Sequence, residues 1–148
     1  MKKITFIISM ITLCVGFSST ASAQVTASAP TTATVVAPIS IVKATDMSFG
    51  NVAVSSTLGT AVLAPASTRT KTGGVTLPAT TGTVTAASFT IGGDSNYTFI
   101  ITLPTTDFTI TKATTLETMI VNAFTSTPSG TGALVTGAAT VLVGATLN

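Results

Sequence analysis

The chain has 148 residues, of which 45% are hydrophobic and only 7% are charged, and it contains no histidine. This length suits one domain of ordinary size, and the high hydrophobic content excludes a charge-rich disordered protein. Six Lys and Arg residues stand against four Asp and Glu residues, and Lys2 and Lys3 account for the whole excess. The remaining charges balance and are dispersed, so no basic surface for nucleic acid is expected.

The first 23 residues have the three-part pattern of an export signal. Two lysines open the segment, an apolar stretch follows over 4–17, and small residues occupy 21–23. We predict a signal peptide over 1–23, because the apolar stretch is shorter than the roughly 20 residues that a membrane-spanning helix needs. Its removal takes away Cys14, the one cysteine, so no disulfide framework is expected. The mature protein is expected in the periplasm, on the outer surface or outside the cell, with no membrane span.

Alternating apolar and polar side chains dominate the chain after a short polar stretch at 24–32, which is predicted to be a linker or N-terminal arm. Period-2 alternation is typical of half-buried β-strands, and the abundant Thr and Val are suited to them. Turn-forming Gly, Pro, Asn, Asp and Ser separate the runs. The predicted strands, in chain order, are 33–42, 60–63, 74–77, 83–91, 96–103, 108–110, 118–123 and 139–147.

These runs predict an all-β fold, an antiparallel β-sandwich forming a single domain over 33–148. Pro38 cannot donate a backbone hydrogen bond, so the first strand is predicted at a sheet edge or a bulge. The stretch from Phe89 to Phe99 is predicted to be a β-hairpin around the Gly-Gly-Asp-Ser-Asn loop at 92–96. The predicted inward-pointing set is Val35, Ile39, Ile41, Phe89, Tyr97, Phe99, Ile101, Val121, Val141 and Val143. The aromatic residues are predicted to be core rather than a sugar-binding platform; they are Phe49, Phe89, Tyr97, Phe99, Phe108 and Phe124.

Catalytic chemistry has few candidate residues. Without histidine there is no ordinary base to activate a Ser or Thr nucleophile, and the mature chain lacks the Cys and His of zinc sites. The three carboxylates considered as a pair for glycoside hydrolysis, Asp94, Asp107 and Glu117, fall in a predicted loop and at two strand starts. Asp94-Ser95-Asn96 resembles the start of a calcium loop, but a turn explains it better because no further acid follows. We therefore predict no catalytic, cofactor-binding or metal-binding residues.

Several segments, taken in order, resemble the bacterial secreted family called domain of unknown function 4402. They are 33–41, 47–52 (Met-Ser-Phe-Gly-Asn-Val), 69–77, 87–92, 97–104 and 129–132. The resemblance implies an immunoglobulin-like antiparallel β-sandwich in an extracytoplasmic protein of Gram-negative bacteria, similar in style to pilin-like subunits, and it supplies no catalytic residues. The family pattern continues with a closing strand beyond the one that matches 141–147. The last strand of the sandwich is therefore expected to be missing from this sequence.

The function expected from these observations is that of an exported, non-enzymatic structural or cell-surface protein, such as a component of adhesion or of an appendage. The alternative is an extracytoplasmic carbohydrate- or ligand-binding β-sandwich module. Neither follows from the fold alone, because one fold serves many functions. Copies of the same chain and other envelope proteins are the partners considered, and none is specified by a motif.

Overall fold

The structure is a computed structural model that describes residues 25–112 and 116–148. This part of the chain contains β-strands and no helix, so the predicted all-β fold is confirmed. It accordingly holds no helix long and apolar enough to cross a membrane. The predicted signal peptide over 1–23 lies outside the described residues. Residues 25–34 form no strand and are exposed, and every strand belongs to the compact unit from Val35 to Asn148.

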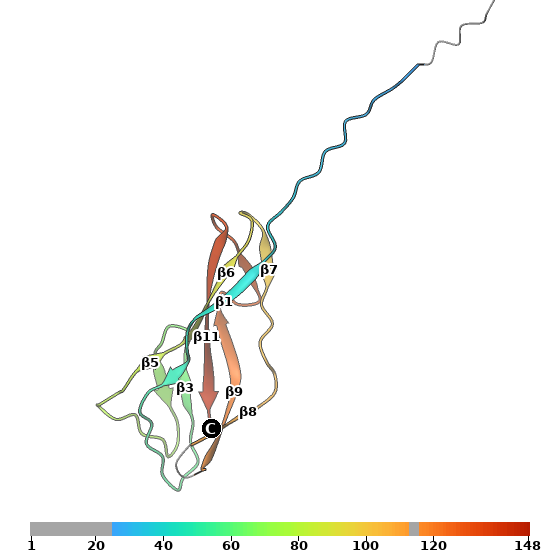
Figure 1. Cartoon of the computed structure of the whole chain (residues 1–148). Helices are drawn as coiled ribbons and strands as arrows, with labels where there is room; N and C mark the ends of the chain where they lie inside the picture. Colours follow the sequence, from blue (N-terminus) through green and yellow to red (C-terminus); the bar gives the residue numbers. More distant parts are fainter. Residues whose placement is uncertain (1–24, 113–115) are drawn as a thin grey trace, which may run out of the picture. The chain divides into compact units, whose positions relative to one another are not determined.

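The strands pair in three antiparallel sheets (Figure 1). The strands are β1 (Ser40–Thr45), β2 (Ser48–Phe49), β3 (Ala61–Leu63), β4 (Arg69–Lys71), β5 (Val84–Thr85), β6 (Ala87–Gly92), β7 (Thr98–Ile100), β8 (Phe108–Thr111), β9 (Thr118–Thr127), β10 (Thr131–Ala133) and β11 (Ala138–Leu147). The seven-stranded sheet has the order β1-β6-β11-β3-β4, with β9 also on β11 and β8 on β9. Two smaller sheets pair β10 with β7 and β2 with β5.

The ten-residue strand β11 organises the large sheet. It pairs with β6 over 138–143, with β9 over 142–147 and with β3 over 145–147. Gly144 permits this crowding, because a Cβ there would overlap the backbone at Leu63 and Ala64. The alternating run predicted over 139–147 is thus confirmed as a strand. It connects β1 and β6 on one part of the sheet with β3 and β4 on the other.

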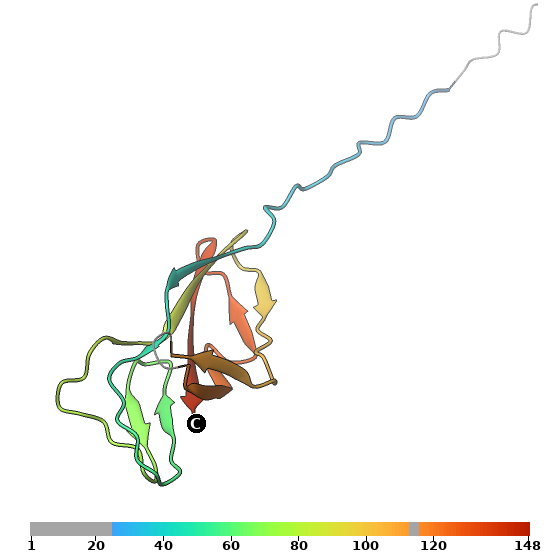
Figure 2. The same ribbon diagram turned by 60° about the horizontal axis from the view of Figure 1, so that its bottom comes forward.

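Two apolar clusters hold the layers together. The first joins the β6 and β11 face to Phe99 of β7 and to Leu134, and the second joins β3, β9 and the end of β11 to Val75. Residues of the large sheet and of the small β7–β10 sheet therefore share one core. These two antiparallel sheets are the layers that pack against each other. Figures 1 and 2 both show β7 as a separate strand beside the large sheet.

The predicted inward set is confirmed in part. Four members are buried, namely Phe99, Val121, Val141 and Val143, and two more, Phe89 and Ile101, are half-buried against the core. The remaining members are exposed and are not part of the core; they are Val35 (93% exposed), Ile39 (61%), Ile41 (67%) and Tyr97 (55%). Ile41 nevertheless shares a sheet face with the buried Ile91. The prediction is wrong for Phe108 as a core aromatic, since its side chain is 47% exposed. The reason is that these side chains lie on edge strands or loops, where no second layer covers them.

The predicted hairpin over 89–99 is wrong. Strand β6 is already paired on both sides, by β1 and by β11, and β7 pairs with β10. The loop at 93–97 therefore carries the chain from one sheet to the other instead of folding it back on its neighbour. Asn96 has a positive φ of 67° in this loop, as expected for a turn residue.

Some predicted strands are shorter in the structure than in the sequence pattern. The first begins only at Ser40, so Pro38 precedes it, and β1 is an edge strand as predicted. The run at 96–103 forms a ladder only over Thr98–Ile100, and the run at 74–77 contributes a single bridge between Thr76 and Ala53. A strand needs a partner on at least one side, and these segments find one over only part of their length.

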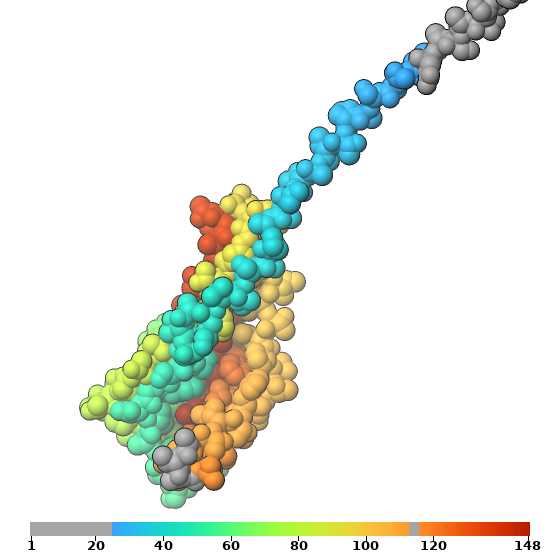
Figure 3. Space-filling model, viewed as in Figure 1, coloured from blue at the N-terminus to red at the C-terminus, as the bar shows by residue number. Residues whose placement is uncertain are grey.

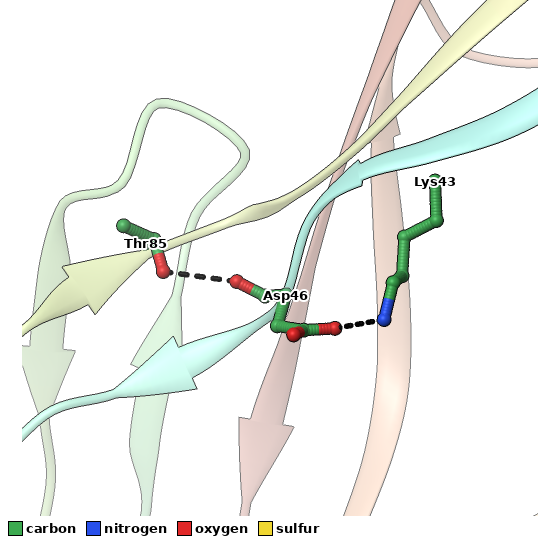
Figure 4. Close-up of polar contacts among 3 residues, drawn as sticks. All are labelled: Lys43, Asp46 and Thr85. Carbon is green, nitrogen blue, oxygen red and sulfur yellow. Dashed lines mark hydrogen bonds and ion pairs between the residues drawn. The ribbon is translucent and has the colours of Figure 1, made fainter.

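Polar contacts around Asp46 fix the turn from β1 into β2 (Figure 4). The Lys43 ammonium forms an ion pair with the Asp46 carboxylate, and the Thr85 hydroxyl donates to the Asp46 backbone oxygen at 2.9 Å. Nearby, the guanidinium of Arg69 donates to the backbone oxygens of Phe49 and Asn51. The side chains of Lys43 and Arg69 therefore link strands β1 and β4 to the residues just after β1 and around the end of β2.

Candidate binding groove

An apolar groove lies on the face shared by β1, β6 and β11. Side chains directly opposite each other across an antiparallel pair lie on the same face. Ile41 of β1 is opposite Ile91 of β6, and Phe89 of β6 is opposite Val141 of β11. All four side chains line the groove and form one continuous floor. The alternation that places them there is the period-2 pattern of the sequence.

The facing wall comes from β7 and the segment that follows it. Phe99, the middle residue of β7, is 8% exposed, and Ile101 and Leu103 continue its face, half-buried against the same cluster. These residues and their neighbours as far as Pro104 line the groove. Figure 3 shows the molecule hollowed between β1 and this segment, with atoms of β11 at the bottom of the hollow.

The absence of a side chain at Gly132 allows the Phe99 ring to lie directly over strand β10. The ring of Phe99 occupies the space that a Cβ at Gly132 would need, so any larger residue there would have to displace the ring. Residue 132 is directly across from Phe99 in the β7–β10 ladder. The ring of Phe99 therefore packs between β10 on one side and the apolar face of the large sheet on the other.

Both rims of the groove lack a sheet neighbour among the described residues. Strand β1 pairs only with β6, so its outer edge is free. The segment 101–104 belongs to no ladder, although the Ile101 amide donates to the Gly130 oxygen at 2.8 Å. The two layers meet at β11 and stay apart on the β1 side. The groove between them has a volume of about 510 Å³, a size common for ligand pockets.

The lining decides what kind of partner the groove can take. Among the side chains that line it, only Thr102 is polar and none is charged. An ion or a highly polar ligand would lose its hydration there without finding a partner. The groove therefore suits an apolar group, or a chain with apolar side chains on one face.

The carboxylates considered from the sequence do not come together. Asp107 and Glu117 lie at opposite ends of the β8–β9 hairpin, where Phe108 pairs with Val121 and Thr111 with Thr118. Asp107 accepts from the Asn122 side-chain amide at 3.0 Å, and Glu117 forms an ion pair with Lys112.

Asp94 lies in a different part of the fold, in the loop between β6 and β7. Its carboxylate accepts from the Ala37 amide at 2.9 Å. No group of three or more His, Cys, Asp or Glu residues that could hold a metal ion is found within 25–112 and 116–148.

A smaller hollow adjoins this loop. It has a volume of about 300 Å³ and is lined by Pro38, Ile39, Asp94, Tyr97 and Leu134, among others. Tyr97 is 55% exposed, so its ring is accessible in this hollow. The sequence pattern had assigned Tyr97 to the core.

A comparison with protein families places the chain. A family model described as "Domain of unknown function (DUF4402)" matches residues 39–148. The chain belongs to this family. The family resemblance seen in the sequence is thereby confirmed, and the matched residues of the DUF4402 domain include every strand and the whole groove. No curated protein and no solved structure matches the chain.

Sequence reasoning found the lining of the groove in the DUF4402 domain but not the groove itself. Phe89, Phe99 and Val141 were predicted to point inward, which is correct. What the pattern did not reveal is that the layers stay apart beside Ile41. No signal in the sequence indicated this, because the alternating run at 96–103 was expected to pair with the preceding strand across the loop at 92–96.

Proposed function

We propose that this DUF4402 protein is exported and acts without catalysis, as a structural or adhesive component of the cell envelope or surface. Its task is to hold another polypeptide at the groove. The pilin-like style and the Gram-negative origin implied by the resemblance are parts of this proposal, as is the immunoglobulin-like type of the sandwich. The observation that carries it is the uncharged groove between two rims that lack a sheet neighbour.

Such a groove suits an extended strand. The free edge of β1 offers backbone N–H and C=O groups in a row, and the floor formed by Phe89, Ile91 and Val141 can take every second side chain of an added strand. This combination is the basis of β-strand addition, in which backbone bonds supply affinity and alternate pockets supply specificity. A partner held in this way needs no catalytic group.

Export is proposed from the N-terminal pattern. Cleavage after Ala23 predicts an intact mass that lacks the first 23 residues, measured on protein recovered outside the cytoplasm. A mature protein that stays in the cytoplasm at full mass would contradict this part of the proposal.

The role of the groove is tested with two matched variants in cells that make the protein. Ile41→Lys adds a charge at the rim, and Val135→Lys adds the same charge at a side chain of similar exposure, 69% against 67%, that does not line the groove. We expect the wild type and Val135→Lys to stay with the washed cell surface and Ile41→Lys to be released. Equal retention of all three would refute a role for the groove in surface attachment.

A carbohydrate- or ligand-binding module is the second candidate, favoured by one observation. The smaller hollow is lined by the exposed Tyr97 and by Asp94, and sites for sugars commonly combine an aromatic face with a carboxylate that accepts hydroxyl hydrogens. A glycan array should then show binding that is lost in Tyr97→Ala. The absence of any glycan above background would eliminate this candidate.

A further inference from the structure

A β-bulge interrupts the long strand β9 beside the groove. The ladder between β9 and β11 shifts register between Gly144 and Thr146, so residues 123 and 124 of β9 together face Ala145. Ala123 has a positive φ of 46°, and in the described part of the chain it is the one non-glycine residue with a positive φ inside a strand. An L side chain crowds the backbone in this conformation, which glycine adopts freely. Bulges of this kind re-aim neighbouring side chains.

The side chain that the bulge re-aims is that of Phe124. Val121 points into the core and is 7% exposed, so regular alternation would place Ala123 on the inner face and Phe124 on the outer one. The structure has the opposite arrangement, because Ala123 is exposed whereas Phe124 is half-buried and lines the groove. The Phe124 ring meets Phe108 edge to face, with centroids 5.6 Å apart. Phe108 is opposite Val121 in the β8–β9 ladder, so all three side chains share the inner face.

Phe124 bounds one end of the groove. The floor runs along β6 from Ile91 to Ala87, which is opposite Val143 of β11. On the other side of β11, Val143 is opposite Ser126, and Phe124 follows two residues further along β9. Phe124 packs against the apolar cluster beneath the groove and also against the second cluster. Its ring therefore separates the Ala87 end of the groove from the second cluster.

We propose that Phe124 is a specificity-determining residue of the groove and that Ala123 is its positioning residue. The ring limits the size of the side chain that a bound strand can place beside Ala87. The inference rests on the proposed function, because the limit acts on a polypeptide held in the groove. An added strand directs every second side chain towards the floor. Valine or a smaller residue fits at this end, whereas a phenylalanine would compete with Phe124 for the same space.

The first test measures this size limit with fluorescein-labelled peptides that carry Val at three alternate positions and Thr between them. One Val at a time is replaced by Phe. We expect the wild type to bind one of the Phe peptides about tenfold more weakly than the all-Val peptide, and Phe124→Ala to bind both equally well. Ile120→Ala truncates an apolar side chain of β9 that does not line the groove, so it should keep the wild-type preference.

Two results of the peptide test would overturn the inference. One is the same preference in the wild type and in Phe124→Ala. The other is a uniform weakening of all peptides by Phe124→Ala, since that would leave the ring only a structural role.

The second test removes the bulge. Deleting Ala123 restores regular alternation, which should turn the Phe124 side chain to the outer face. The folded deletion variant is then expected to accept the same Phe peptide as Phe124→Ala does. A folded deletion variant that keeps the wild-type preference would overturn the positioning role of Ala123.

The third test needs no peptide and uses variants with small effects on folding. The Ala123 side chain is exposed, so substitutions there report on the backbone. Ala123→Gly should melt a few degrees above the wild type and Ala123→Val below it, because β-branched residues strongly disfavour a positive φ. Thr125 is an exposed position of the same strand outside the bulge, where the Val variant should be more stable than the Gly variant. The same order at both positions would overturn the strained bulge.

The inference and the proposed function fail in different ways. If Ile41→Lys is released from cells but no Phe peptide is disfavoured, the groove holds a polypeptide and only the size limit is wrong. If no peptide binds and Ile41→Lys remains on the cell surface, the proposed function is wrong and the size limit fails with it.

Discussion

The contact between Phe99 and Gly132 gives the sharpest prediction, because one side chain fills the space that the other residue leaves. Phe99→Ala removes a ring that is 8% exposed. Such a change in a packed core costs about 3–5 kcal/mol in the free energy of unfolding. Since one side of the ring already borders the open groove, the space left behind is not sealed, and we expect a cost near the lower end of that range, about 3 kcal/mol.

Gly132→Ala alone should also destabilise the protein. The added methyl overlaps the Phe99 ring, and overpacking of this kind costs about 1–3 kcal/mol. In the Phe99→Ala background the ring is gone, so the methyl enters free space. There the change should be neutral or stabilising by up to about 1 kcal/mol, because alanine restricts the unfolded chain more than glycine does. The two substitutions are therefore predicted to be strongly non-additive.

Urea unfolding of the four proteins, followed by far-ultraviolet circular dichroism, measures this coupling. All four are compared at one protein concentration, because any self-association would make the midpoint depend on concentration. Equal slopes with denaturant would show that the unfolded states are comparable. We expect a coupling free energy of about 1–3 kcal/mol. Additivity within about 0.5 kcal/mol would refute the described packing of the ring on β10.

Three further predictions use the same unfolding assay. Leu63→Ala, at a fully buried position, should cost about 3–5 kcal/mol, and a loss below 1 kcal/mol would place that side chain on the surface. Gly144→Ala should lower the free energy of unfolding more than Gly130→Ala does, because a Cβ at 144 overlaps backbone atoms. A Cβ at 130 meets nothing within 4 Å, so that change adds only the strain of a positive φ. Equal losses would contradict the close approach of β3 to Gly144. Arg69→Met should cost about 1.5–3 kcal/mol by removing charge-assisted bonds to two backbone oxygens, whereas Lys43→Met, which breaks an exposed ion pair, should change stability by less than about 1 kcal/mol; the reverse order would contradict the described contacts.

The local pattern of the chain was enough to determine its class and much of its core. Alternation with β-branched residues determines which face of a strand a side chain occupies, and this holds for Phe99, Val121, Val141 and Val143. The same alternation predicted β11 almost to its ends, whereas the strand predicted at 118–123 covers only the first part of β9, which continues to Thr127. The order and spacing of the segments were also sufficient to identify the family.

Only the tertiary structure decided which alternating runs acquire neighbours and which faces are covered. Ile41 and Phe89 have the same local pattern, yet Ile41 is 67% exposed because β1 is an edge, whereas Phe89 is half-buried between β1 and β11. The run at 96–103 forms a strand only where β10 pairs with it. A side chain's face depends on residues beside it in the chain, but its burial and its ladder depend on strands that are distant in the sequence. The groove depends on such distant pairing. It lies between β1 and the segment 101–104, and no described strand pairs with both of them.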